Sequence, residues 1–320
     1  MRIVVAGLGS SGSYLLHLLS RSGFDAFGFD PKKEGYYIPC GYAANRHSMT
    51  DLLSWTNLDF STYIESKAEE IVFSGTSRRE FRFRSRGIVT FDKNRLESDL
   101  LNECKWSRTT VNGSYDILVD ATGVSRHYLP KVEDYRMHTI EYITSLEEKK
   151  EFQFRYFPQG SGYFWIFPKG NKYHVGAGSS SIANIKSSLA PYTPEKIVSR
   201  DIRLKPLLHS ISDGNVIGIG EAIGTVSPIT GEGIVPSMKS AFLLFTAITR
   251  SNDLNTIKEN YASLIKKEFS RYYTLYDLLR SFQDSTIQKR KAISYIRASR
   301  KDLREFGIDF KISHVLREFL

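Results

Sequence analysis

The chain has 320 residues, of which 41% are hydrophobic and 25% are charged, as is ordinary for a globular protein of one large or two modest domains. No apolar run reaches the roughly 18–20 residues of a membrane span, and two cysteines, Cys40 and Cys104, exclude a disulfide framework and a cysteine metal cluster. The first residues are strand-like, which predicts that there is no signal peptide, and the cysteine usage predicts a reducing, cytoplasmic location. The net charge of +9 predicts acidic partners.

A nucleotide-binding motif opens the chain. Residues 2–6 predict a buried strand, residues 13–22 have the apolar spacing of a helix, and residues 25–29 predict a second strand. The turn between the first strand and the helix is Gly-x-Gly-x-x-Gly, which provides a tight turn, room for a pyrophosphate and a close helix–strand contact. Asp30 ends the second strand, where it can accept a hydrogen bond from a ribose hydroxyl. The predicted cofactor contacts are Gly7, Gly9, Ser10, Ser11, Gly12 and Asp30. This motif alone leaves FAD and NAD open.

Residues 36–91 contain two patterns whose meaning the residues alone leave open. The apolar turn at residues 36–44 holds Cys40 and Gly41, and Cys40 there is equally a site residue or a buried structural cysteine. Residues 69–91 predict antiparallel strands in which Phe81 and Phe83 alternate with arginines. Interleaved arginines and aromatics can bind nucleic acid, but we favour a solvated strand face and expect no nucleic-acid partner.

An aromatic strand is predicted in the second half of the chain. Residues 139–157 alternate as one or two strands, and residues 172–178 predict another. Between them Tyr163, Trp165 and Phe167 stand two residues apart, so in a strand all three point to one face. Such a face suits a long apolar ligand, although by itself it is more often part of a core.

A second glycine-rich turn follows. Residues 216–219 predict a buried parallel strand, and residues 241–248 predict a small apolar helix. A strand, a glycine-rich turn and a helix in that order make an anion site, because backbone N–H groups and the positive end of the helix face the ligand. The residues of this turn are Gly220, Glu221, Gly224, Pro228, Gly231, Gly233 and Ile234.

These motifs together resemble a known family. The second turn, G-E-A-x-G-x-x-x-P-x-x-G-E-G-I, is similar to the second flavin motif of FAD enzymes with the para-hydroxybenzoate hydroxylase fold, and most similar to that of the geranylgeranyl reductases. Pro-Cys-Gly at residues 39–41, D-A-T-G at residues 120–123 and Y-x-W-x-F-P at residues 163–168 are similar to elements of the same family. A second flavin motif favours FAD, since NAD domains carry none.

The resemblance implies a role for each motif. Cys40 and Gly41 would lie beside the flavin ring, with Cys40 as the catalytic residue. Lys93 stands where the family has an arginine that contacts FAD, so Lys93 or Arg95 is expected to supply this contact. Glu221 stands where the family has an aspartate on the ribityl chain. The other implied cofactor contacts are Asp120, Gly123, Gly220, Gly224, Pro228, Gly231, Gly233 and Ile234, and the implied substrate wall is Tyr163, Trp165 and Phe167.

The resemblance also implies the architecture. We expect an α/β fold with a Rossmann-like FAD-binding domain, a smaller β-rich substrate domain and a helical C-terminal tail. The FAD-binding domain is expected at residues 1–60, 87–125 and 205–250, and the substrate domain at residues 61–86 and 126–204. Residues 251–320 are expected to be helical and are strongly basic.

The implied activity is reduction of isoprenoid double bonds of the geranylgeranyl type by hydride transfer from reduced FAD. The alternatives are an FAD-dependent monooxygenase of the same fold and a non-catalytic FAD- or lipid-binding protein. The expected partners are an isoprenoid lipid and a ferredoxin-like or NAD(P)H-dependent electron donor, with no metal. The basic tail fits a membrane-surface face and a solvated helix surface equally well. Cys40, Tyr163 or a flavin-bound water would supply the proton.

Overall fold

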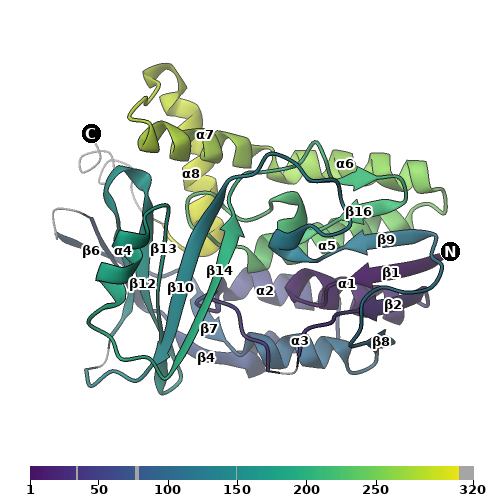
Figure 1. Cartoon of the computed structure of the whole chain (residues 1–320), viewed down its shortest axis with the longest axis horizontal. Helices are drawn as coiled ribbons and strands as arrows, with labels where there is room; N and C mark the ends of the chain where they lie inside the picture. The colour runs from purple at the N-terminus through teal and green to yellow at the C-terminus, as the bar shows by residue number, and fades with distance from the viewer. Residues whose placement is uncertain (34, 76–78, 149, 310–320) are drawn as a thin grey trace.

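The structure is a computed structural model that describes residues 1–33, 35–75, 79–148 and 150–309. A parallel sheet with helices on it forms one side of the molecule, and a large antiparallel sheet forms the other (Figure 1). The C-terminal helices run along the top of this view and reach both parts. Residues 310–320 of the predicted helical tail lie outside the described residues.

The nucleotide-binding sheet has six strands and is mostly parallel. Its strand β1 lies between β2 and β9, pairs with both in parallel, and is buried at four of its five residues. The strands in spatial order are β15 (Ser212–Asp213), β16 (Val216–Gly218), β9 (Ile117–Asp120), β1 (Arg2–Ala6), β2 (Asp25–Phe29) and β8 (Trp106–Ser107). The strands predicted at residues 2–6 and 25–29 are therefore confirmed.

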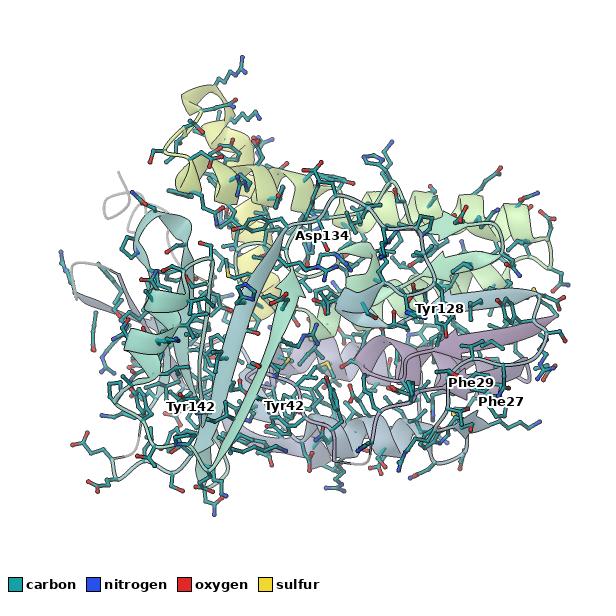
Figure 2. All side chains as sticks on the ribbon, viewed as in Figure 1. Phe27, Phe29, Tyr42, Tyr128, Asp134 and Tyr142 are labelled. Atoms are coloured by element: carbon teal, nitrogen blue, oxygen red, sulfur yellow. The ribbon has the colours of Figure 1, made fainter. Side chains whose placement is uncertain are left out.

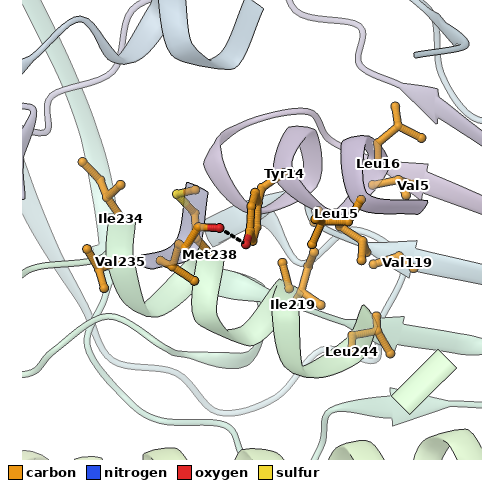
Figure 3. Packing of buried hydrophobic residues seen from close by; sticks show 14 of the residues in the cluster. Val5, Tyr14, Leu15, Leu16, Val119, Ile219, Ile234, Val235, Met238 and Leu244 are labelled. Carbon is orange, nitrogen blue, oxygen red and sulfur yellow. Dashed lines mark hydrogen bonds between the residues drawn. The ribbon is translucent and has the colours of Figure 1, made fainter. Parts of the chain in front are cut away.

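Two helices pack together on this sheet, α1 (Ser10–Arg21) and α5 (Ile234–Thr249). Figure 3 shows Tyr14 and Leu15 of α1 close to Met238 and Leu244 of α5. The Tyr14 hydroxyl, which is fully buried, donates a hydrogen bond to the Leu52 carbonyl at 2.6 Å. This buried hydroxyl is thus satisfied inside the core.

A small three-stranded sheet lies next to the nucleotide-binding part and carries two capped helices. Asn45 caps α2 by accepting a hydrogen bond from the His47 N–H, and Asp92 caps α3 by accepting one from the Arg95 N–H. The elements are β3 (Ala43–Asn45), β7 (Ile88–Phe91), β4 (Ile64–Lys67), α2 (Arg46–Leu53) and α3 (Lys93–Leu101). Strand β4 pairs with β7 here, although it falls within the segment expected in the substrate domain.

The second large sheet has seven strands. Its neighbouring strands are antiparallel except for the parallel pair β11–β5. The strands in spatial order are β14 (Lys196–Arg203), β10 (Arg136–Thr144), β13 (Lys172–Ser179), β12 (Gly162–Lys169), β11 (Phe152–Tyr156), β5 (Glu70–Ser74) and β6 (Glu80–Arg84). On β6 the arginines Arg82 and Arg84 are exposed, and Arg82 pairs with Glu151 at 2.5 Å. This is the predicted solvated strand face.

The two faces of this sheet bury different clusters. Phe164 and Ile166 of β12 pack on one face with helix α4 (Ile182–Leu189). Trp165 and Phe167 of the same strand point to the other face, toward the nucleotide-binding part. The alternation predicted for β12 is thus confirmed.

Three helices end the described chain: α6 (Leu254–Phe269), α7 (Arg271–Gln283) and α8 (Ala292–Phe306). Helix α6 lies along α5, whereas α8 crosses to the second sheet, where Leu303 and Phe306 join the cluster around Trp165 and Phe167 (Figure 1). Among the described residues, no helix combines the length and the apolar character that crossing a bilayer requires.

Candidate active site

The first glycine turn has the geometry of a pyrophosphate cradle. A side chain at Gly7 would place its Cβ 2.6 Å from the Ala121 carbonyl oxygen, and one at Gly12 would place its Cβ 1.9 Å from the Gly7 carbonyl oxygen. At Gly9 a Cβ would meet no atom within 4 Å. Helix α1 begins after Gly9, and no side chain among the described residues caps it. Open space therefore faces the N–H groups of Ser10 and Ser11, as an anion requires.

Asp30 lies at the carboxyl end of β2, beside this turn. It is buried, and its carboxylate accepts hydrogen bonds from the Leu8 N–H at 2.8 Å and the Lys32 N–H at 3.0 Å. The Lys32 ammonium lies 3.5 Å from the same carboxylate. The structure thus places Asp30 at the sheet edge at which a ribose is predicted.

Of the two basic residues predicted on α3, one faces the turn. Lys93 is only 6% exposed and forms an ion pair of 2.7 Å with Glu97, which accepts a hydrogen bond from the Ser10 hydroxyl at 2.7 Å. Arg95 is 56% exposed, and its guanidinium lies 3.8 Å from Asp99. The structure brings Lys93, and not Arg95, to the first glycine turn.

The end of β9 is held by its own aspartate. The Asp120 carboxylate is fully buried and accepts hydrogen bonds from the N–H groups of Thr122, Tyr128 and Leu129 at 2.9–3.1 Å. Asp120 therefore shapes this turn. Gly123, in the same turn, has a φ of +67°, and a Cβ there would lie 3.5 Å from the Glu221 carboxylate.

The second glycine turn touches the first. A Cβ at Gly220 would lie 2.7 Å from the Ser11 hydroxyl oxygen, so both turns border one region. Gly224 is packed against the Lys205 carbonyl, and a Cβ there would lie 2.4 Å from that oxygen. Pro228 is buried, Gly233 caps α5, and Ile234 is the first residue of that helix.

Glu221 is held by two arginines that sequence reasoning missed. Its carboxylate pairs with the Arg200 guanidinium and accepts a hydrogen bond from the Arg203 N–H at 2.8 Å. The Arg203 guanidinium is buried and donates to the Glu221 carbonyl at 2.7 Å. Both arginines come from β14, far from Glu221 in the sequence, and no local pattern announces them. The two arginines thus bind the same carboxylate that is predicted to contact the ribityl chain.

The Cys40 turn has an unusual backbone. Gly41 and Tyr42 follow one another with φ values of +61° and +48°, a left-handed pair that is costly at the buried tyrosine. Tyr42 lies where the two large parts of the molecule meet (Figure 2), stacked on Tyr37 at 4.7 Å. Burial raises the pKa of the Cys40 thiol to about 11, which Lys93 opposes and Glu141 reinforces. Cys40 is therefore a protonated thiol at neutral pH.

The predicted aromatic residues link this turn to the second glycine turn. A Cβ at Gly41 would lie 2.6 Å from the Phe167 ring, so Phe167 packs directly on the Cys40 turn. The Tyr163 hydroxyl donates to the Thr230 carbonyl of the second turn, and the Tyr163 and Trp165 rings lie 5.7 Å apart. Trp165 and Phe167 are buried under Leu303 and Phe306 of α8. The described aromatic face is therefore covered by a helix of the same chain.

A buried glutamate that sequence reasoning also missed lies behind this arrangement. Glu141 of β10 has no exposed surface and accepts hydrogen bonds from the Gly41 N–H at 2.6 Å and the Trp165 indole N–H at 3.2 Å. Its only sequence signal was a charged residue inside an alternating strand pattern.

Comparison with known proteins supports the motif-based resemblance. The chain is 29% identical over 151 residues to a digeranylgeranylglycerophospholipid reductase of Methanosphaera stadtmanae, in an alignment that covers 40% of this chain and 38% of that protein. The match thus spans well under half of that relative's length. No protein-family model matches the chain.

Solved structures share the whole fold. A geranylgeranyl bacteriochlorophyll reductase-like protein of Thermoplasma acidophilum superposes with a TM-score of 0.74 at 15% identity, over 100% of this chain and 99% of that one. A probable FAD-dependent monooxygenase of Pseudomonas aeruginosa gives a TM-score of 0.66 at 14% identity, over 93% and 99%. The chain therefore has the predicted α/β fold of FAD-dependent oxidoreductases.

Proposed function

We propose that this chain, whose resemblance to the geranylgeranyl reductase-like FAD-dependent family is confirmed by partial sequence similarity and a full-length match in fold, reduces isoprenoid double bonds with FAD. One observation carries the proposal: the aromatic strand β12 touches both turns that the motifs assign to the flavin. Phe167 packs on Gly41 beside Cys40, and Tyr163 bonds to Thr230. An apolar chain lying against this strand, which α8 covers in this structure, would be next to the expected flavin ring.

The residues suit FAD at three places. Gly9 and the uncapped start of α1 offer space and N–H donors for the pyrophosphate. Asp30 lies at the strand end where a ribose would bind, and Lys93 brings a buried positive charge to the same turn. When bound and reduced, FAD supplies a hydride from its N5 to one carbon of a double bond.

The chain itself has to stabilise charge and provide a proton. The faces of Trp165 and Phe167 can stabilise the positive charge that develops at a branched alkene carbon. The second hydrogen is a proton, and the protonated Cys40 thiol and the Tyr163 hydroxyl are its candidate donors. A ferredoxin-like or NAD(P)H-dependent donor must restore the two electrons that each reduction consumes.

The test begins with the natively purified protein. An absorption spectrum and mass analysis of the released small molecule identify the cofactor. The protein is then chemically reduced without oxygen and mixed with a geranylgeranyl lipid. We expect a product that has gained two hydrogen atoms per reduced bond. FAD-loaded protein that leaves every polyprenyl lipid unchanged would favour the non-catalytic alternative.

A monooxygenase is the second candidate, because a probable FAD-dependent monooxygenase shares the fold over most of its length. The two activities differ in how the reduced protein reacts with oxygen. A monooxygenase in air should transfer an oxygen atom to its substrate, whereas the proposed reductase should add hydrogen in the absence of air. Product mass under both conditions separates them.

We also propose a peripheral contact with an anionic membrane through the outer face of α8. Arg297, Arg300 and Arg304 are exposed at helical spacing, and Ile293 on the same face is 69% exposed. A basic helix face with an exposed apolar residue suits the headgroup region of an anionic bilayer. The inner face of this helix covers the aromatic cluster, so a lipid surface there would lie close to the proposed substrate wall.

A further inference from the structure

Glu141 lies at the centre of a buried network that spans three strands. In the register of the sheet, Glu141 of β10 and Trp165 of β12 both stand opposite Gly176 of β13. A Cβ at Gly176 would lie 2.2 Å from the indole ring. The glycine therefore lets the indole lie flat across β13, so that its N–H reaches the Glu141 carboxylate at 3.2 Å.

The other carboxylate oxygen of Glu141 faces a fully buried histidine. His174 Nδ1 lies 2.7 Å from Glu141 Oε1, and His174 Nε2 lies 3.0 Å from the Tyr37 hydroxyl oxygen. An ionised carboxylate can only accept, so Nδ1 carries the proton and, in the neutral ring, Nε2 accepts from Tyr37. Burial, and then the charge of Glu141, raises the pKa of Tyr37, which keeps its hydroxyl a donor.

The carboxylate thus has three N–H donors inside the protein, which is what stabilises a buried anion. Two of these three donors belong to regions that are proposed to form the active site. The Gly41 N–H is in the turn of Cys40, and the indole N–H is in the aromatic strand. Moving this one side chain would move both.

We propose that Glu141, held by His174 and Tyr37, is a positioning residue that fixes the Cys40 turn and the Trp165 ring relative to each other. The consequence of this positioning is the alignment of a proton donor with the substrate wall, and this consequence rests on the proposed function. The contacts themselves do not depend on that function.

The charge of Glu141 gives a readout that needs no substrate. The charged groups that act on Cys40 are Lys93 from α3, Arg200 from β14 and Glu141 from β10. Lys93 and Arg200 favour the thiolate, whereas Glu141 opposes it. Only the thiolate is alkylated, so the pH profile of Cys40 alkylation reports on the network.

The experiment compares Glu141→Gln with Glu195→Gln, a matched change at an exposed glutamate that pairs with Lys172 on the same sheet. Each protein, as purified, is treated with iodoacetamide between pH 7 and 10, and the Cys40 peptide is quantified by mass spectrometry. Glutamine can keep the geometry, because its carbonyl accepts from Gly41 and Trp165 while its amide donates to the other tautomer of His174. We therefore expect Glu141→Gln to fold.

In Glu141→Gln, the alkylation profile should move to lower pH, with labelling at pH 8 roughly threefold faster or more. Glu195→Gln should follow the wild type. Trp165→Phe keeps most of the ring but removes the indole N–H, and should speed labelling by a smaller factor. Because both changes act on one network, their effects in the double variant should not multiply.

An unchanged profile in Glu141→Gln, or independent effects in the double variant, would overturn the proposal. Neither result depends on alkene reduction, since the labelling uses no lipid and no reductant. Conversely, a protein that reduces no lipid but shows the shifted profile would contradict the proposed function and leave the positioning role standing.

Discussion

The three glycines of the first turn differ in what a side chain would meet. At Gly9 the φ of −75° suits any residue and a Cβ meets nothing within 4 Å, so Gly9→Val should fold normally. The valine would fill the space proposed for the pyrophosphate. We expect the variant to purify without FAD and to unfold at the temperature of the wild-type apoprotein, as measured by absorbance and thermal melting.

Gly12→Ala is the informative contrast. Its Cβ would lie 1.9 Å from the Gly7 carbonyl, so this variant should lose stability as well as cofactor. A Gly9→Val protein that retains one FAD per chain would contradict the predicted position of the pyrophosphate.

Cys40 allows a second test at a single residue. Cys40→Ser leaves the backbone of the turn intact but replaces the thiol with a hydroxyl that is a weaker acid. We expect FAD to remain bound and alkene reduction to slow or to give other products, as measured by product analysis after a single turnover. Wild-type rates with an unchanged product distribution would show that Cys40 is a structural residue only.

Two acids lie at the second glycine turn, Asp302 of α8 and Glu232 of the turn itself. The Ser227 hydroxyl donates to Asp302 of α8 at 2.6 Å, and Glu232 accepts from the Val235 N–H at 2.8 Å. Burial raises the pKa of Asp302 to about 6 and that of Glu232 to about 8, from 3.8 and 4.5. The folded protein therefore holds protons that the unfolded chain has released over this range of pH.

Protons held only in the folded state make stability fall as pH rises. With respect to these two groups, we expect the free energy of unfolding to be highest below about pH 4, where both states hold the protons, and to fall by several kcal/mol as the pH rises toward 8. Glu232→Gln cannot ionise and should flatten much of this fall in denaturant titrations at several pH values. Glu195→Gln, at an exposed site, should not; equal pH dependence in all three proteins would contradict the assignment.

The aromatic strand offers a test at the level of one element. Trp165→Ala should weaken binding of a geranylgeranyl lipid far more than binding of FAD, and could remove roughly 3–5 kcal/mol if the site does not collapse. Part of this loss is stability, because the ring packs on Gly176 and bonds to Glu141. The change in lipid affinity must therefore be compared with the change in unfolding free energy. If unfolding accounts for all of it, the ring is ordinary core.

Sequence reasoning succeeded for elements whose signal is local. The strands at residues 2–6 and 25–29 and the alternation along β12 follow from apolar periodicity and a glycine motif, and the structure has them. The Glu141 network could not be predicted in the same way. Glu141 and His174 meet through the register of β10 on β13, and register between distant segments leaves no local mark. Arg200 of β14 and Glu221 of the second glycine turn likewise meet only in the folded chain. The pitch of α3 places Lys93 toward the first glycine turn and Arg95 toward Asp99.

At the scale of the whole molecule, the chain has a net charge of +9, and the outer face of α8 exposes Arg297, Arg300 and Arg304. We expect the protein to co-sediment with vesicles that contain anionic lipid, and added salt to weaken this binding. Replacing Arg297 and Arg300 by glutamine should reduce the bound fraction severalfold. The control replaces Lys67 and Arg84, which are exposed on β4 and β6, with the same change in charge. Equal loss in both variants would argue against a specific face.

The pairing of β16 with β9 has a consequence for how the protein is made. A ribosome releases β1, β2 and β9 early. The second neighbour of β9, strand β16, emerges only after the whole seven-stranded sheet, including β10 to β14, has been synthesised. During that interval the nascent chain presents an unpaired apolar edge at Ile117–Asp120, the kind of edge that other strands can join. Chains halted before Val216 should therefore depend on chaperones and be cut readily by proteases. We therefore expect the nascent protein to become resistant to proteases when β16 completes the six-stranded sheet, and not when β1, β2 and β9 have paired.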